Sequence, residues 1–257
     1  VSIYMGKKDN ETAEKILGNC FAMQIIISAI LTAVLLIWSR DLLMLFGASR
    51  KSIEYAVSYM NIYAVGTIFV ELTLGMNAFI TAQGFAKTGM LSVLIGAISN
   101  IILDPILIFG LCGLPKMGVT GAAVATVIGQ CVAAVVAFTC NHKYNHEVKL
   151  IFRGFRPSGR IIGTIYAIGI PSIIMQSIGS VMTYSMNRIL IEFSSTATAV
   201  FGVYFKLQSF FFMPVFGLNN GITPIIAFNY GAQNRKRMVK TIKLSMITAF
   251  CLTFIGF

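Results

Sequence analysis

The sequence predicts an all-α integral membrane protein, a polytopic helical bundle, and three observations support this fold class. Of the 257 residues, 56% are hydrophobic and only 11% are charged, whereas soluble domains carry about 25% charged residues. The mean hydropathy is +0.81. Apolar stretches long enough to cross a bilayer, which takes about 20 residues, recur along the chain with short polar segments between them.

Seven such stretches, taken in order, predict about seven transmembrane helices. Six are complete, at 18–38, 60–81, 90–111, 118–140, 161–191 and 198–229, and a seventh begins at residue 243. The fifth and sixth stretches are longer than a bilayer requires. Because proline lacks an N–H and its ring clashes with the preceding turn, we expect Pro171 to break the fifth helix. We expect Pro214 and Pro224 to break the sixth in the same way, with unwound backbone around Asn219 and Asn220 between them.

The basic residues of the connecting segments predict how the chain is oriented in the membrane. Fourteen Lys and Arg residues lie in one set of segments, at 1–17, 82–89, 141–160 and 230–243. Only four lie in the alternate set, at 39–59, 112–117 and 192–197. Because cytoplasmic loops carry an excess of Lys and Arg, the first set is predicted to be cytoplasmic. The net charge of +11 is then explained by membrane topology, and no nucleic-acid partner is expected.

Residues 1–10 resemble residues 226–235, which suggests an internal repeat. Each segment has an apolar end, one glycine and then polar residues that lead into a new span. The offset encloses six predicted spans, an even number, so both copies are expected on the same face of the membrane. Two halves related by an axis along the membrane normal would produce this pattern, which is found in transporters. We also expect a piece of a longer protein, because the chain lacks an initiator Met and ends within an apolar run.

Asp104 is the strongest functional candidate, because a carboxylate inside an apolar span is costly and usually binds or moves something. Asn100 lies on the same helix face, at the i, i+4 spacing. Pro105 follows directly and deprives the carbonyl of Ile101 of its usual N–H donor. These oxygen atoms suit a proton or a small cation. A hydrogen bond from Asp104 to another helix is the alternative explanation.

The next span supplies polar residues that are expected to face Asp104. Thr126 and Gln130 share a helix face, and the short segment 112–117 predicts that the two spans are antiparallel neighbours. At 1.5 Å per residue, Asp104 and Thr126 lie about 10 Å and about 12 Å from the same end of this pair. Small residues at 118–125 favour a close approach of the helices. Ordinary interhelical hydrogen bonding would also explain Thr126 and Gln130.

Other polar residues are weaker candidates. Glu71, near the middle of the second span, is a possible second proton carrier or the partner of a basic residue. Asn77 on the same span is explained by packing as well as by function. Gln176 and Asn220 are candidates for lining a substrate cavity. No metal site is predicted, because His142 and His146 have the i, i+4 spacing but no clear third ligand.

Three motifs stand out together: Asn100–Pro105 with Phe109 and Gly110, Gly118–Thr126, and Pro224 with Asn229–Ala232. With Ala82–Gly84, which agrees as well, they resemble the motifs of the multidrug and toxic compound extrusion (MATE) family, in particular its bacterial MepA-like branch. The resemblance implies part of a two-lobe bundle of twelve helices. Residues 1–140 would belong to the first lobe (its helices three to six), 141–160 to a cytoplasmic loop, and 161–257 to the start of the second lobe (helices seven to nine).

The resemblance also implies a function: a secondary antiporter in the bacterial inner membrane that exports cationic, often aromatic compounds in exchange for H⁺ or Na⁺. It implies that Asn100, Asp104 and Thr126 form the coupling site, together with an Asp on a helix outside this chain. Small cationic molecules and membrane lipids would be the partners of a monomer, with no cofactor beyond the coupling ion and no enzymatic activity. The rival functions are a flippase for lipid-linked sugars, which would need a strongly cationic cavity, and a membrane receptor or scaffold.

Overall fold

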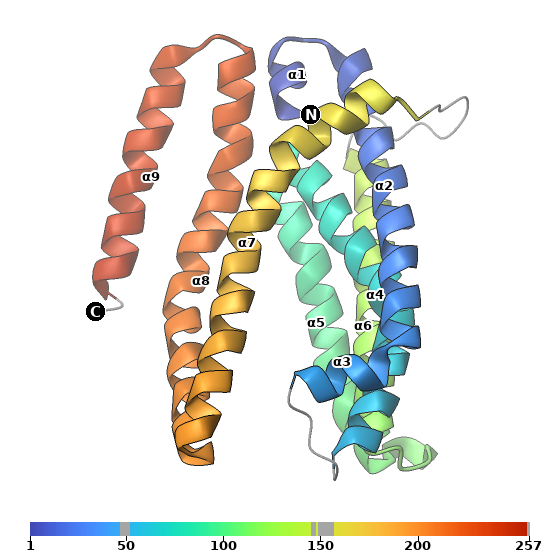
Figure 1. Cartoon of the computed structure of the whole chain (residues 1–257). Coiled ribbons are helices and arrows are strands. Elements are labelled where there is room, and N and C mark those ends of the chain that lie inside the picture. Colours follow the sequence, from blue (N-terminus) through green and yellow to red (C-terminus); the bar gives the residue numbers. More distant parts are fainter. Residues whose placement is uncertain (47–51, 145–147, 149–156, 256–257) are drawn as a thin grey trace. The chain divides into compact units, whose positions relative to one another are not determined.

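The computed structural model describes residues 1–46, 52–144, 148 and 157–255, and every regular element in these ranges is helical. Figure 1 shows their order along the chain. The helices are α1 (Ser2–Gly6), α2 (Asn10–Ile37), α3 (Ser39–Leu45), α4 (Ile53–Ala82), α5 (Ala86–Phe109), α6 (Val119–Tyr144), α7 (Gly159–Phe193), α8 (Ser195–Gly231) and α9 (Arg235–Ile255), with a short 3-10 turn η1 (Leu111–Gly113) between α5 and α6. The predicted all-α class is confirmed.

In the part of the chain that the structure describes, six helices are long and apolar enough to cross a membrane: α2, α4, α5, α6, α7 and α8. Each corresponds to one of the predicted complete spans. The predicted seventh span lies in helix α9, which is not among these six helices. Five basic residues within residues 235–243 occupy the start of α9 and leave only its second half apolar.

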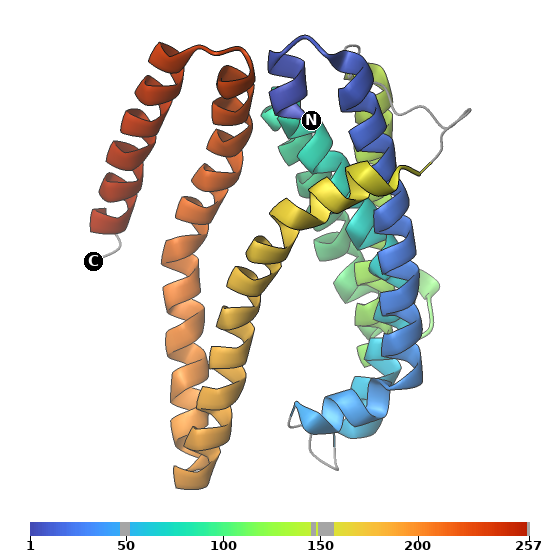
Figure 2. The same ribbon diagram turned by 45° about the horizontal axis from the view of Figure 1, so that its top comes forward.

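The predicted helix breaks at proline are wrong. α7 is one helix through Pro171, and α8 is one helix through Pro214 and Pro224. A proline removes one backbone hydrogen bond and bends a helix, but the bonds on either side continue it. Figure 2 shows α7 curved in the half that contains Pro171. Asn219 is helical too, and its carbonyl accepts a hydrogen bond of 2.8 Å from the hydroxyl of Thr223.

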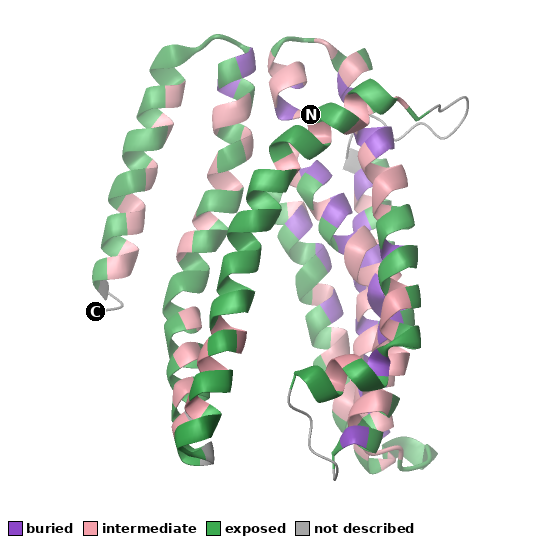
Figure 3. Ribbon diagram, viewed as in Figure 1, coloured by how far each residue is buried: buried purple, intermediate pink, exposed green. Residues whose placement is uncertain are grey.

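The chain divides into two compact units, which we describe separately. The first contains residues 10–157, and the second contains residues 2–9 and 158–257. In the first unit, α6 packs against α4 and α5, and α2 packs against α4. Buried residues concentrate on these four helices (Figure 3). In the second unit, α7 has no buried residue. The assignment of the two units to family lobes stays a prediction, although α1 belongs to the second unit.

The two similar segments of the sequence have the same helix boundaries. α1 ends at Gly6 and α8 ends at Gly231, while α2 begins at Asn10 and α9 at Arg235, so each pair is 225 residues apart. The turns between them match as well. Lys8 has φ 61° and Gln233 has φ 54°, a conformation that residues other than glycine seldom adopt. The amide that follows donates a 2.9 Å hydrogen bond to a carbonyl five residues back, from Asp9 to Tyr4 and from Asn234 to Asn229. The repeat inferred from the sequence is therefore confirmed at this turn.

The two copies also contact each other within the second unit, where α1 packs against α8. A Cβ atom at Gly6 would collide with the carbonyl oxygen of Phe228, and one at Gly231 would collide with that of Ile3. Ile3 and Phe228 are equivalent positions of the repeat, so the contact is reciprocal, as in a two-fold symmetric interface. Both turns consequently lie at the same end of the α1–α8 pair. The direction of the axis relative to the membrane stays a prediction.

Candidate functional site

The site begins with the close packing of α5 against α6. A Cβ atom at Gly96 would lie 2.6 Å from the Cβ of Ala133, and one at Gly121 would lie 2.6 Å from the carbonyl oxygen of Leu107. Between these levels, Gly129 faces the backbone of Gly96. Small residues at helix crossings let membrane helices approach until backbone touches backbone. The predicted antiparallel pairing of these two spans is confirmed, and it sets the depth at which their polar residues meet.

Asn100 joins the two helices at this crossing. Its Nδ2 donates to Oδ1 of Asp104 over 3.3 Å and to Oγ1 of Thr126 over 3.4 Å. The Thr126 hydroxyl in turn donates to the carbonyl of Ala122 over 2.9 Å. All three polar side chains are half-buried. The structure thus brings together the three residues that the sequence nominated for a coupling site, which we call the Asn100–Asp104–Thr126 cluster.

Within the described residues, Asp104 forms no ion pair with a basic side chain. α5 continues through Pro105, so the carbonyl of Ile101 has no N–H from that position. The cluster therefore offers a carboxylate, two polar oxygen atoms and a freed carbonyl within about one helical turn. Such oxygen-rich sites suit a proton or a small hard cation.

Asn77 has a structural partner. Its Oδ1 accepts a 2.7 Å hydrogen bond from the hydroxyl of Ser92, which is fully buried, and the pair joins α4 to α5. Packing therefore explains this side chain. Its Nδ2 is buried without a hydrogen-bond partner among the described residues.

The remaining candidates lie away from the hydrogen bonds of the cluster. Gln130 is half-buried on α6, one helical turn beyond Thr126, and Glu71 is half-buried on α4. Gln176 on α7 and Asn220 on α8 are exposed and belong to the second unit. The predicted roles of these residues, in ion coupling or in lining a cavity, stay predictions.

Sequence reasoning missed Gln24 on α2. Its side-chain amide lies directly over Gly75 of α4, where any Cβ would collide with it. Its Oε1 is buried without a hydrogen-bond partner in the described parts of the chain, a rare and costly state for a polar atom. Gly75 is four residues beyond Glu71, so both lie on one face of α4. The Gln24 amide of α2 therefore contacts the face of α4 that carries Glu71. An uncharged amide inside an apolar span was the available signal, and it is weaker than the charge that drew attention to Asp104.

The described residues contain no group of three or more His, Cys, Asp or Glu that could hold a metal ion. His142 lies near the end of α6, while His146 lies outside the described residues. The candidate functional site is therefore the Asn100–Asp104–Thr126 cluster between α5 and α6.

Comparison with known proteins agrees with this geometry. The chain is 28% identical over 260 residues to the multidrug export protein MepA of Staphylococcus haemolyticus, covering 99% of this chain and 56% of that protein. It is also similar to two solved structures. One is the MATE multidrug transporter DinF-BH in complex with R6G, with 29% identity and a TM-score of 0.89 over 99% of this chain and 56% of that one. The other is a MOP superfamily transporter from Pyrococcus furiosus, with 25% identity, a TM-score of 0.89 and the same coverage.

The chain thus spans about half the length of the relatives that it matches. The MatE family model matches residues 1–106 and 171–257, which include Asn100 and Asp104 and both copies of the repeated turn. With a helical fold shared with MATE transporters and a family match over most of its length, the chain belongs to the MatE family.

Proposed function

We propose that the protein containing this chain is a secondary antiporter that exports cationic or aromatic compounds in exchange for H⁺ or Na⁺. The observation that carries the proposal is the Asn100–Asp104–Thr126 cluster: an unpaired carboxylate, half-buried between two membrane-spanning helices and hydrogen-bonded to an amide. Ionisable residues inside a membrane typically mark ion pathways or proton relays. Membership of the MatE family and the similarity to proteins named as multidrug exporters support the same function.

The cluster supplies a simple coupling step. When Asp104 is ionised, its carboxylate accepts a hydrogen bond from the Asn100 amide and attracts a cationic compound. A proton on Asp104, or a Na⁺ held by its oxygen atoms, removes that attraction. Compound and ion then compete for one negative charge, which is the requirement for exchange. The two hydrogen bonds that Asn100 donates are long, so the amide can turn away when the ion binds.

Pro105 offers a way to transmit the change along α5. The helix lacks one backbone hydrogen bond beside Asp104, and this position bends more easily than the rest of α5. We assign Glu71 the secondary role of a second carboxylate, supported by its half-buried position in α4 and by the buried Gln24 amide on the same face. Gln130, Gln176 and Asn220 are proposed to line the path of the exported compound.

The proposed setting is the inner membrane of a bacterium, with the protein acting as a monomer on small cationic molecules and surrounded by lipid. Segments 1–17, 82–89, 141–160 and 230–243 would be cytoplasmic, in accord with their excess of Lys and Arg. The bacterial origin of the relatives supports this setting.

Asp104→Asn in the full-length protein tests the proposal. The amide keeps the size of the side chain, but it carries no charge and does not take up or release a proton as the pH changes. We expect ion-driven efflux of a fluorescent cation from proteoliposomes to fall to the level of protein-free liposomes. Membrane insertion and thermal stability should be retained.

Asp41→Asn is the matched control, because Asp41 is an exposed acid in the first turn of α3. It should leave efflux unchanged. Undiminished ion-driven efflux by Asp104→Asn would contradict the proposal. A wild-type protein that moves lipid-linked sugars and no cations would instead identify a flippase, and one that moves neither would identify a receptor or scaffold.

A further inference from the structure

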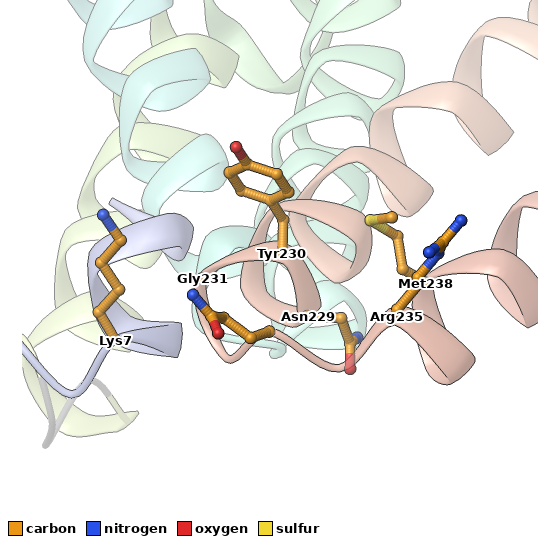
Figure 4. A pocket seen from close by; sticks show the side chains of 7 residues that line it. Lys7, Asn229, Tyr230, Gly231, Arg235 and Met238 are labelled. Atoms are coloured by element: carbon orange, nitrogen blue, oxygen red, sulfur yellow. The ribbon is translucent and has the colours of Figure 1, made fainter.

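A cavity of about 380 Å³ lies in the second unit, where α1, the end of α8 and the start of α9 meet. Its polar lining consists of the side chains of Lys7, Asn229, Tyr230, Gln233 and Arg235. Figure 4 shows Lys7 and Arg235 on opposite sides of the Tyr230 ring. The volume falls in the range of small-ligand pockets, about 300–1,000 Å³. The cavity is separate from the Asn100–Asp104–Thr126 cluster, which belongs to the first unit.

The lining of this cavity is cationic. Among the residues that the structure describes, Lys7 and Arg235 are the charged ones in the lining, and none of the lining residues is a carboxylate. Neither cation belongs to an ion pair among the described residues, where the paired cations are Lys15 and Arg40. The Lys7 ammonium lies 5.4 Å from the centre of the Tyr4 ring, a contact that leaves its charge in place. Amide and phenol groups add neutral hydrogen-bond donors beside the two charges.

This combination suits a phosphate group. Arg presents a planar fork of N–H donors that matches phosphate oxygens, and Lys binds phosphate as a point charge. The cavity also lies at the end of α8, a helix apolar enough to cross a membrane. The phosphates of lipid headgroups lie at that level of a bilayer, and basic pockets between helix ends bind anionic headgroups. Tyr230 is typical of the same interfacial zone.

We propose that this pocket binds a phosphate group, carried by an anionic phospholipid or by a free phosphate ion. The position of the pocket at a helix end favours the lipid. Lys7, which follows α1, and Arg235, at the start of α9, would both add positive charge to the site. It does not depend on the transport function, because binding to it is measured without transport.

The experiment compares two double variants of the full-length protein with equal loss of charge. Lys7→Gln/Arg235→Gln removes both pocket cations. Lys8→Gln/Lys236→Gln is the matched control, since both residues are exposed neighbours that do not line the cavity. Glutamine suits position 8, because the equivalent residue Gln233 has the same positive φ. Native mass spectrometry in a neutral detergent measures binding of phosphatidylglycerol, of phosphatidylcholine and of inorganic phosphate.

We expect phosphatidylglycerol to bind the wild type and the control variant with similar affinity, and phosphatidylcholine to bind much more weakly. Since each Lys or Arg near an anionic lipid contributes about fivefold in affinity, removing both pocket cations should weaken binding by about 25-fold. Displacement of the lipid by inorganic phosphate would show that the site also binds the free phosphate ion. Binding of the lipid alone would identify the headgroup as the ligand.

Equal weakening in the two double variants would overturn the proposal, because it would show a diffuse effect of surface charge. Unchanged binding in Lys7→Gln/Arg235→Gln would overturn it as well. If this double variant is not monodisperse, Lys7→Gln and Arg235→Gln are measured singly, each with an expected loss of about fivefold.

Discussion

At the scale of the residue, Asn100 is the centre of the candidate site. It donates to Asp104 on its own helix and to Thr126 on the neighbouring one. The two distances, 3.3 and 3.4 Å, lie beyond the range of 2.7–3.2 Å that is usual for N–H···O bonds. Both hydrogen bonds are therefore longer than usual, which is compatible with the proposed exchange of an ion at this cluster.

Thr126→Val tests the hydroxyl within the cluster. Valine keeps the branched shape but cannot accept the hydrogen bond from the Asn100 amide and cannot bind a cation. If one hydrogen bond contributes about 1 kcal/mol, the apparent affinity for the coupling ion should fall about fivefold. The measurement is the ion concentration, or the pH, that gives half-maximal efflux in proteoliposomes.

Thr139→Val is the matched control for this prediction. Thr139 lies on the same helix, is exposed, and bonds only to the carbonyl four residues back at Val135, as Thr126 does to Ala122. An equal shift of the half-maximal ion concentration in both variants would contradict the prediction. It would show that each threonine acts on the stability of α6 and that the Thr126 hydroxyl has no specific role in ion binding.

At the scale of the element, the α5–α6 crossing positions the cluster. Gly96, Gly121 and Gly129 allow the two backbones to touch, and α5 passes through Pro105 without ending. The contact between the helices fixes Asn100 opposite Thr126, whereas the spacing of Asn100 and Asp104 is a property of α5 alone.

Gly129→Ala tests the crossing. The new Cβ would lie 2.9 Å from the carbonyl oxygen of Gly96 and 3.0 Å from the Cβ of Asn100, so α5 and α6 must separate. Overpacking of this kind costs about 1–3 kcal/mol. We expect a lower melting temperature and weaker ion-driven efflux of the purified, reconstituted protein.

Gly89→Ala on α5 is the comparison for that variant. Its nearest neighbours would lie at 3.4 Å from the new Cβ, on Asn77 and Thr81, which is an ordinary contact. It should leave both the melting temperature and efflux close to those of the wild type. A Gly129→Ala protein as stable and active as Gly89→Ala would refute the importance of the close crossing.

At the scale of the whole molecule, an internal repeat and a charge asymmetry organise the chain. The turns after α1 and α8 share helix boundaries, positive φ angles and backbone hydrogen bonds. Gly6 lies against the carbonyl of Phe228 and Gly231 against that of Ile3, which makes the contact reciprocal. Segments rich in Lys and Arg alternate with segments that are poor in them, which predicts one orientation in the membrane.

Single cysteines test this orientation in a variant whose five native cysteines are replaced. Position 87 lies in the segment 82–89, which is predicted to be cytoplasmic, and position 116 lies in the segment 112–117, which is predicted to be external. Both positions are exposed, and each is changed from Lys to Cys. A membrane-impermeant thiol reagent should label Lys116→Cys in intact cells and Lys87→Cys only after permeabilisation. The reverse pattern would invert the predicted topology.

Much of the candidate site followed from the sequence, because its signals are local. A carboxylate in an apolar run, an amide four residues before it and a short loop to the next span already indicated Asp104, Asn100 and Thr126. Gln24 escaped notice because an uncharged amide carries a weaker signal. The expected helix breaks in α7 and α8 were wrong, because one proline removes one hydrogen bond and the rest of a long helix persists.

By itself the sequence determined the helical membrane class, six of the seven predicted spanning helices, the repeated turn and the residues most worth testing. These depend on hydropathy and on spacing within one segment. Only the tertiary structure decided that the Asn100 amide reaches Thr126 and that the Gln24 amide lies over Gly75. It also decided that Lys7 and Arg235 line one cavity. The physical reason is that such contacts join residues far apart in sequence, and their geometry is set by how closely the helices pack.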